Sequence, residues 1–285
     1  MKKIEEIALG IKSVYPSAEN RHYLIPLIHK IIKKHRKGKT LIVGIQGGQG
    51  TGKTTLSNFI QEILVKSGYT VQAFSIDDFY ETAAARRKLA QKYAGNTFYQ
   101  ISRGMPGTHR VKELLKTLQN IRNGKPFSIP VFDKSLHDAY GDIAGRKKVN
   151  QKPDIVLFEG WCVGIPAVSS KELIRICQLN KIDLQKVDPH LMYHKPVLEF
   201  IPQYRPLWTF INYCIMLKPT SAEVHKKWRL QQERELQMKK GSGMSASAVS
   251  HFVDEYLPFT YVCYEKIKAD TTIYLNENHR IYRMK

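Results

Sequence analysis

The stretch "GGQGTGKT", Gly47 to Thr54, constrains this chain more than any other. It satisfies the pattern G-x-x-x-x-G-K-[ST], in which glycines let successive backbone N–H groups turn toward one anion at a helix N-terminus. An apolar, β-branched run precedes it at residues 40–45, and apolar residues recur at helical spacing after it as far as Leu64. This strand, loop and helix predict a phosphate-binding loop (P-loop) in a parallel α/β sheet.

The residue types of the loop predict their roles toward a nucleoside triphosphate. Lys53 is expected to reach the outer phosphates, and the Thr54 hydroxyl is expected to ligate Mg²⁺. A loop of this kind does not by itself separate a kinase from an ATPase or a GTPase. The nucleotide-binding residues that we predict are Gly47, Gly48, Gln49, Gly50, Thr51, Gly52, Lys53, Thr54 and Thr55.

Acidic residues follow two further predicted strands. "SIDDFY" ends the strand at 71–76, and "LFEGW" ends the strand at 154–158. Because the carboxyl ends of parallel strands face the ligand crevice, Asp77, Asp78 and Glu159 are expected to converge on the P-loop. A kinase needs one such carboxylate to accept the proton of the acceptor hydroxyl, and another to hold the metal or its waters. The alternative for each acid is a cap of the following helix.

The remaining pattern predicts one domain over residues 1–285, with the N-terminal residues 1–39 as a basic helical extension. We expect a three-layer α/β fold of the P-loop type, with a mainly parallel sheet. Helices are predicted over 81–93, 111–121, 221–240 and 245–268, and further strands over 210–217 and 271–276.

The chain carries a formal net charge of +20, from 45 Lys and Arg against 25 Asp and Glu. Such a charge indicates either a polyanionic partner or small anionic substrates bound by a basic protein. The densest run, His29 to Lys39, lacks the interleaved aromatic residues that stack single-stranded bases. We therefore favour the solvated end of a helix over a nucleic-acid patch.

No apolar run has transmembrane length, and no apolar stretch of the signal-peptide type follows the N-terminal lysines. We expect a cytoplasmic protein without a membrane partner. The four cysteines, which have no paired or metal-ligand spacing, are expected to be buried, reduced thiols.

Several motifs resemble the P-loop small-molecule kinases that include uridine kinase, phosphoribulokinase and bacterial pantothenate kinase. "DDFY" after the second strand and "FEG" at the third carry this resemblance. Within the group the chain is most similar to the D-glycerate 3-kinases of plant and fungal type. That similarity rests on ordered stretches over about residues 40–260, among them "QGGQGTGKTT", "SIDDFY", "RGMPGTH", "PVFDKS", "LFEGWCVG", "WRLQQE" and "FVDEYLP".

The resemblance implies ATP-dependent phosphorylation of a hydroxyl on a small organic acid, with ATP and Mg²⁺ as cofactors. D-glycerate, converted to 3-phosphoglycerate, is the leading substrate. Asp77 maps onto the proposed base of the family. Glu159 maps onto the glutamate of the third strand, which with Thr54 would hold the metal while Asp78 orders its waters.

The resemblance also implies a lid over residues 221–243. The lid arginines of such kinases close over the transferring phosphate, which points first to Arg229 and then to Arg234. Closure would exclude water and suppress ATP hydrolysis. Most of the charges on this helix are expected to belong to its solvated face.

The acceptor site is predicted from two segments. Arg103 in "RGMPGTHR" suits the carboxylate of a small hydroxy acid, unless it meets solvent or a neighbouring acid. With it we predict His109, Asp133 and Lys134 as acceptor-binding residues, although the last two could form only a local ion pair. His137, which matches a histidine of the uridine kinases, is not predicted to be a base.

Three residues depart from the glycerate kinase pattern: Arg110 replaces an aspartate, Phe132 a tyrosine and Ile143 an arginine. A base in place of an acid near the acceptor indicates either a more anionic acceptor or a rearranged surface. The alternatives are therefore a kinase of another small acceptor, such as uridine or pantothenate, and a nucleic-acid-associated P-loop ATPase. The third strand ends in "FEG" rather than an Asp-Glu pair, which disfavours the ATPase. The oligomeric state is not predicted.

Overall fold

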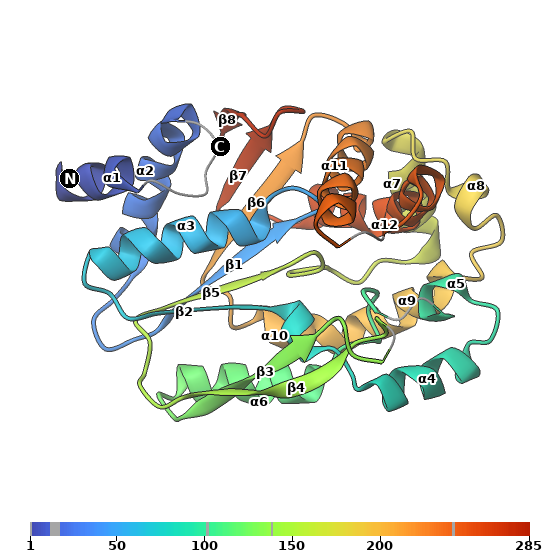
Figure 1. The fold of residues 1–285 in the computed structure, drawn as a ribbon, viewed down its shortest axis with the longest axis horizontal. Helices are drawn as coiled ribbons and strands as arrows, with labels where there is room; N and C mark the ends of the chain where they lie inside the picture. The colour runs from blue at the N-terminus through green and yellow to red at the C-terminus, as the bar shows by residue number, and fades with distance from the viewer. Residues whose placement is uncertain (1, 12–17, 101–102, 138, 241–242) are drawn as a thin grey trace.

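The computed structural model describes residues 2–11, 18–100, 103–137, 139–240 and 243–285. Its centre is a six-stranded sheet with the strand order β2-β5-β1-β6-β7-β8 (Figure 1). All neighbouring strands pair in parallel except β8, which is antiparallel to β7. The bounds are β1 Leu41–Gly47, β2 Val71–Ser75, β5 Ile155–Gly160, β6 Tyr213–Pro219, β7 Thr271–Leu275 and β8 Ile281–Met284.

The central strands are buried on both faces. Every residue of β1 and of β5 is buried, so neither strand shows the alternation of a half-exposed sheet. Helices cover the two faces, as the continuous apolar runs of these strands require. The prediction of an α/β fold with a mainly parallel sheet is confirmed.

Two hydrophobic cores lie on opposite faces of the sheet. One core contains side chains of α1 (Lys2–Gly10), α2 (Ala18–Lys34), α3 (Lys53–Lys66) and the start of α11 (Ala222–Lys240). The other core contains side chains of helices that lie between β2 and β7 in the sequence. Its helices and their neighbours are η1 Ile76–Phe79, α4 Ala83–Lys92, α5 Thr97–Gln100, α6 Val111–Arg122, α7 Ser170–Leu179, α8 Leu184–Val187, α9 His194–Phe200, η2 Ile201–Tyr204, α10 Arg205–Trp208 and α12 Ala246–Lys266.

A separate antiparallel hairpin, β3 (Phe127–Asp133) and β4 (Asp142–Val149), lies beside α6 below the main sheet (Figure 1). The sequence did not predict it, because β4 has no buried residue and therefore no apolar alternation. The buried Arg86 of α4 fixes the connection between the two strands, since its guanidinium donates to the carbonyls of Tyr140 and Gly141. The hairpin end is thereby held near the end of β2.

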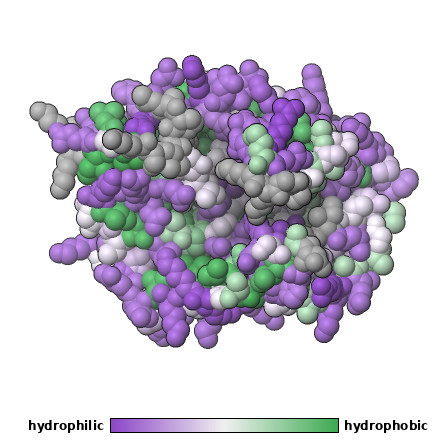
Figure 2. Space-filling model, in the orientation of Figure 1, coloured by the Kyte–Doolittle hydropathy of each residue, from purple (hydrophilic) through white to green (hydrophobic). Residues whose placement is uncertain are grey.

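The first part of the basic run, residues 29–34, is the end of a helix, as the sequence predicted, and residues 35–39 form the turn that follows it. α2 ends at Lys34, and its last turn contains Lys33 and Lys34, where cations favour the helix dipole. Hydrophilic side chains cover most of the face seen in Figure 2, and apolar ones are exposed there in small groups. The four cysteines are buried and free. Among the described residues, no helix has the length and apolarity that a membrane crossing requires.

Phe158 tests the importance of the buried central strand. It is fully buried in β5, and its ring lies 5.1 Å from that of Phe74. We expect Phe158→Ala to lower the free energy of unfolding by about 3–5 kcal/mol, because it leaves a cavity between the sheet and its helices. Urea unfolding measures the loss. Leu179→Ala, at a site that is 66% exposed, is the control and should stay within about 0.5 kcal/mol. Equal losses in both variants would contradict this description of the core.

Candidate active site

The P-loop follows β1 at the point where the strand order of the sheet reverses. β5 pairs with one side of β1 and β6 with the other, which is where parallel α/β sheets bind their ligands. α3 begins at Lys53, directly after the loop. Gly50 has a φ of 75°, and a Cβ at this position would lie 2.7 Å from that of Trp228. Only glycine meets both conditions, so the loop follows the path that the motif predicts.

The ammonium group of Lys53 is part-buried in the loop and donates to the carbonyl of Gly48 at 3.1 Å. Burial lowers the pKa of Lys53, and the negative charges of Glu159 and Asp77 oppose that shift. The ammonium group of Lys53 is thus directed into the loop, close enough to both carboxylates for their charges to act on it. This is the placement expected of a cation that binds phosphate oxygens.

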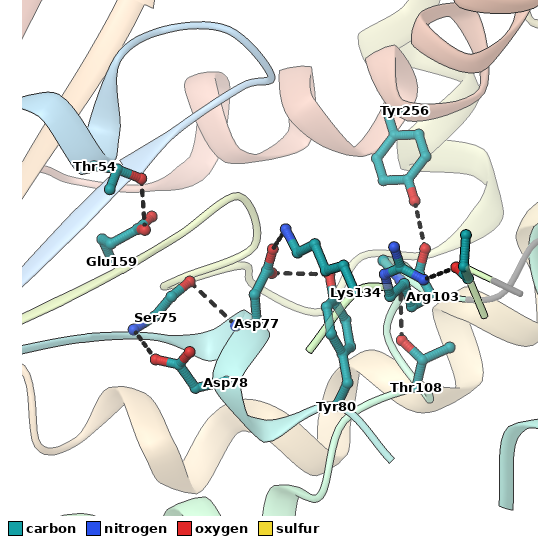
Figure 3. A network of polar contacts seen from close by, with 12 residues as sticks. Thr54, Ser75, Asp77, Asp78, Tyr80, Arg103, Thr108, Lys134, Glu159 and Tyr256 are labelled. Atoms are coloured by element: carbon teal, nitrogen blue, oxygen red, sulfur yellow. Dashed lines mark hydrogen bonds and ion pairs between the residues drawn. The ribbon is translucent and has the colours of Figure 1, made fainter. Parts of the chain in front are cut away.

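Thr54 and Glu159 meet at the carboxyl edge of the sheet (Figure 3). The Thr54 hydroxyl donates to Glu159 Oε1 at 3.0 Å. Glu159 is opposite Ile45 of β1 and Ser75 of β2 in the strand register, which fixes its distance from both neighbouring strand ends. Burial raises the pKa of Glu159, and the charge of Lys53 opposes the shift.

These two side chains fit Mg²⁺, a hard cation that prefers oxygen ligands and keeps several waters. Thr54 and Glu159 supply oxygen donors only, and they lie beside the loop that is predicted to hold phosphates. The described residues contain no group of three or more His, Cys, Asp or Glu that could hold an ion by itself. A metal here would therefore take its remaining ligands from water and phosphate.

Asp77 follows β2 and lies between the P-loop and the hairpin. Its Oδ1 accepts a hydrogen bond from the Tyr80 hydroxyl at 2.8 Å, and its Oδ2 lies 3.7 Å from Lys134 Nζ (Figure 3). The Asp77 side chain is 38% exposed, so it is open to a ligand. Burial raises the pKa of Tyr80 well above its usual value, which keeps the tyrosine a proton donor to Asp77.

Asp78 points to the backbone rather than to the P-loop. Its Oδ2 accepts the N–H of Ser75 at 2.9 Å, while Ser75 Oγ accepts the N–H of Asp77. The pair forms a capping box at the start of η1, and burial raises the pKa of Asp78. The structure therefore brings Asp77 and Glu159 together with Lys53 and gives Asp78 the role of a helix cap. A metal role for Asp78 stays a prediction.

The predicted acceptor residues Arg103, Asp133 and Lys134 lie at or beside the hairpin, and one of them contacts Asp77. Arg103 Nη1 donates to the carbonyls of Ala139 and Tyr140, both at 2.9 Å, so it helps to fix the hairpin connection. Asp133 accepts hydrogen bonds from Ser135. The Lys134 ammonium lies 3.7 Å from Asp77 Oδ2.

His109 is buried behind Tyr80. The two rings stack with their centroids 4.7 Å apart, and His109 Nδ1 lies 2.8 Å from the Tyr204 hydroxyl. Burial lowers the pKa of His109 to about 4, opposed by the charge of Asp77. Its Nε2 has no hydrogen-bond partner among the described residues. Binding of an acceptor by His109 stays a prediction.

Of the three departures from the family pattern, Phe132 and Ile143 lie in the hairpin and Arg110 lies at the start of α6. Arg110 pairs with Glu113 at 2.5 Å, and Glu113 pairs in turn with Arg146 of β4. Phe132 pairs with Ile143 across the hairpin and contacts the Tyr80 ring edge-on at 5.2 Å. The guanidinium of Arg110 is thus used in a local ion-pair network, which favours a rearranged surface over a more anionic acceptor.

The helix predicted to be a lid, α11, is attached to the P-loop by its first half. Trp228 packs on Gly50, and its neighbour Arg229 forms an ion pair with Glu233 at 2.8 Å. The Arg229 guanidinium also lies 5.6 Å from the centre of the Phe252 ring. The Arg229 side chain therefore contacts residues of α11 and α12 in this structure. To bind a phosphate, it would have to break its ion pair with Glu233.

A cavity of about 370 Å³ adjoins the P-loop. Sequence reasoning missed it, because its walls come from α11 and the end of β7 as well as from the loop, and only "WRLQQE" in α11 offered a signal. A hollow of this size beside the start of α3 suits the base and sugar of a nucleotide. It is lined by Gly50, Thr51, Gly52, Thr55, Trp228, Gln231, Gln232, Glu235, Leu275 and His279.

The strand order, the P-loop and the two strand-end carboxylates define the class of P-loop kinases. Comparison with known proteins agrees. The profile of the phosphoribulokinase/uridine kinase family matches residues 42–174. The uncharacterized kinase mug58 of Schizosaccharomyces pombe is 34% identical over 249 residues, which are 85% of this chain and 87% of that protein. The chain belongs to the phosphoribulokinase/uridine kinase family of P-loop kinases.

Two further similarities fall within the same group. The chloroplastic D-glycerate 3-kinase of Arabidopsis thaliana is 29% identical over 226 residues, which cover 76% of this chain and 46% of that protein. The solved structure of D-glycerate 3-kinase from Cryptococcus neoformans var. grubii has a TM-score of 0.78 at 24% identity, covering 99% of this chain and 98% of the other. The second similarity concerns the fold.

The buried His109 predicts a loss of stability in acid. Because its pKa is about 4 in the folded chain and 6.5 for an unperturbed histidine, the unfolded state binds the proton more readily, and stability falls as the pH drops from 6.5 toward 4. His109→Gln removes this contribution, so its deficit in unfolding free energy should shrink by up to about 3 kcal/mol over that range. Urea unfolding at several pH values measures it. The control is His22→Gln, at an exposed histidine, whose deficit should not change with pH in this way. If the deficit of His109→Gln were independent of pH, the lowered pKa of His109 would be contradicted.

Proposed function

We propose that this P-loop kinase transfers the γ-phosphate of ATP to a hydroxyl of a small organic acid, and that D-glycerate, giving 3-phosphoglycerate, is the leading acceptor. One observation carries the proposal: the half-exposed Asp77 carboxylate lies at the same sheet edge as Lys53 and Glu159, with a cation, Lys134, 3.7 Å away. The name of the Arabidopsis thaliana relative, D-glycerate 3-kinase, supports the choice of acceptor.

The phosphate side of the proposed reaction uses the P-loop. Its backbone N–H groups and Lys53 bind the phosphates, and Thr54 and Glu159 hold Mg²⁺. The metal, when bound, neutralises charge that develops on the phosphates. The nucleoside occupies the cavity beside the loop, between Trp228 and Thr55.

The acceptor side uses the end of β2 and the hairpin. Asp77 accepts the proton of the attacking hydroxyl, and Tyr80 holds the other carboxylate oxygen by its hydrogen bond. In D-glycerate a single carbon separates the C3 hydroxymethyl group from the carboxylate. A base and a carboxylate-binding cation must therefore lie close together, as Asp77 and Lys134 do. Arg103 and His109 complete the proposed acceptor site from the side of the "RGMPGTH" segment.

α11 supplies the remaining proposed group. Arg229 leaves Glu233 and stabilises the transferring phosphoryl group. Because the first half of α11 is packed on the P-loop, the movement that brings Arg229 to the phosphate is confined to its side chain and to the part of the helix that follows it.

A product assay tests both the acceptor and the base. With MgATP and D-glycerate, L-glycerate, uridine or pantothenate offered separately, we expect phosphoglycerate from D-glycerate, detected by mass spectrometry. Asp77→Asn should lower kcat by about 10²- to 10⁴-fold, since the general base is lost, while the affinity for ATP changes little. Asp183→Asn is the matched control, because this exposed aspartate caps α8 away from the site.

The other outcomes separate the alternatives. Phosphorylation of uridine or pantothenate, with D-glycerate inert, would reject the acceptor and keep the kinase chemistry. ATP hydrolysis without a phosphorylated acceptor would reject the proposed reaction. Full activity of Asp77→Asn would reject the proposed base.

A further inference from the structure

Two histidines from outside the P-loop hold successive carbonyl groups of the loop. His225 of α11 lies with Nδ1 2.9 Å from the carbonyl oxygen of Gln49. His279, in the turn between β7 and β8, lies with Nε2 2.7 Å from the carbonyl oxygen of Gly50. Neither histidine lies in the P-loop motif or in the motifs at the strand ends.

These contacts determine which ring nitrogens carry protons. A carbonyl oxygen only accepts hydrogen bonds, so His225 Nδ1 and His279 Nε2 must be the protonated nitrogens. His225 Nε2 lies 3.2 Å from the Tyr264 hydroxyl, which in turn accepts the N–H of Gly48 at 3.0 Å. The tyrosine therefore donates its proton to His225 Nε2. The result is a closed chain of hydrogen bonds from Gly48 through Tyr264 and His225 back to Gln49.

Side chains of α11 pack closely against the loop and restrict its conformation. A side chain on Gly48 would overlap the His225 ring, and one on Gly50 would meet Trp228. Trp228 stacks on His279 with the ring centroids 4.2 Å apart, and its Nε1 donates to the carbonyl of Glu277 at 2.8 Å. α11 and the β7–β8 turn are thus joined to each other as well as to the loop.

The hydrogen bonds set the direction of two peptide groups. In a planar trans peptide, the C=O of one residue and the N–H of the next point in opposite directions. A donor that holds the Gln49 carbonyl on one side therefore turns the Gly50 N–H to the other. The contact to Gly50 orients the Thr51 N–H in the same way, and in this structure that N–H donates to the Gly48 carbonyl at 3.4 Å. Because P-loops bind anions through such N–H groups, the orientation of these two peptides affects phosphate affinity.

We propose that His225 and His279 are positioning residues that orient the 49–50 and 50–51 peptide groups of the P-loop for phosphate binding. His225 acts as the neutral Nδ1–H form fixed by Tyr264. The inference rests on the proposed function only in that the loop binds nucleotide phosphates, and it does not depend on the identity of the acceptor.

Binding measurements test the proposal. The probes are MgADP and inorganic pyrophosphate, studied by isothermal titration calorimetry, since pyrophosphate reports on the phosphate cradle alone. We expect His225→Phe and His279→Phe to weaken both ligands by roughly 10- to 100-fold, because a carbonyl loses its donor. His225→Asn, whose amide N–H can replace Nδ1–H, should recover most of the affinity.

Controls separate positioning from a loss of stability. His194→Asn changes another buried histidine, which contacts Asp188 rather than the loop, and should leave both affinities unchanged even if the unfolding midpoint falls. Unchanged affinities in both phenylalanine variants would overturn the proposal. A wild-type protein that binds neither ligand would reject the nucleotide-binding role itself, and the positioning role with it.

A second measurement needs no variant. Long-range ¹H–¹⁵N NMR spectra of the wild-type protein report which nitrogen of each histidine ring carries the proton. We expect the Nδ1–H form for His225 and the Nε2–H form for His279, both without ligand and with MgADP. The opposite tautomer at His225 would overturn the hydrogen-bond chain on which the proposal depends.

Discussion

The charge of the part-buried Lys53 ammonium, opposed by two nearby carboxylates, is the interaction on which the rest of the site depends. Burial of a cation is unfavourable unless opposite charges and hydrogen-bond acceptors surround it. Here Glu159 and Asp77 provide the charges, and the Gly48 carbonyl accepts a hydrogen bond. Gly48 follows β1, Glu159 lies near the end of β5, and Asp77 follows β2. The three groups therefore meet Lys53 only because β1, β5 and β2 lie side by side in parallel register. The strand order of the sheet is therefore a condition of the site's electrostatics.

The loops that surround these charged residues are themselves held in place by hydrogen bonds from other parts of the chain. Arg86 and Arg103 hold the carbonyls of the hairpin connection, which places Lys134 beside Asp77. α11, α12 and the β7–β8 turn hold the P-loop from another side, through His225, Tyr264 and His279. This edge of the sheet is thus enclosed by elements far apart in the sequence, from the P-loop to the β7–β8 turn. This explains why so much of the C-terminal half packs against a loop at residues 47–54.

Local patterns predicted the P-loop, the strand-end acids and the parallel sheet, because each depends on residues close together in the sequence. The hairpin was not predicted, since the exposed strand β4 has no apolar period. His225 and His279 lie 176 and 229 residues from the carbonyls that they contact, and no motif marks them. Asp77 and Asp78 are adjacent and chemically identical, and only the structure shows that one is open while the other caps η1.

Transfer of phosphate to a carbon-bound hydroxyl is the central claim, and ³¹P NMR of the wild-type protein with MgATP and D-glycerate tests it most directly. We expect the γ-phosphate resonance of ATP to be replaced by a phosphomonoester resonance coupled to the C3 methylene protons of glycerate, with little inorganic phosphate. Inorganic phosphate as the product, formed at the same rate with and without D-glycerate, would contradict it.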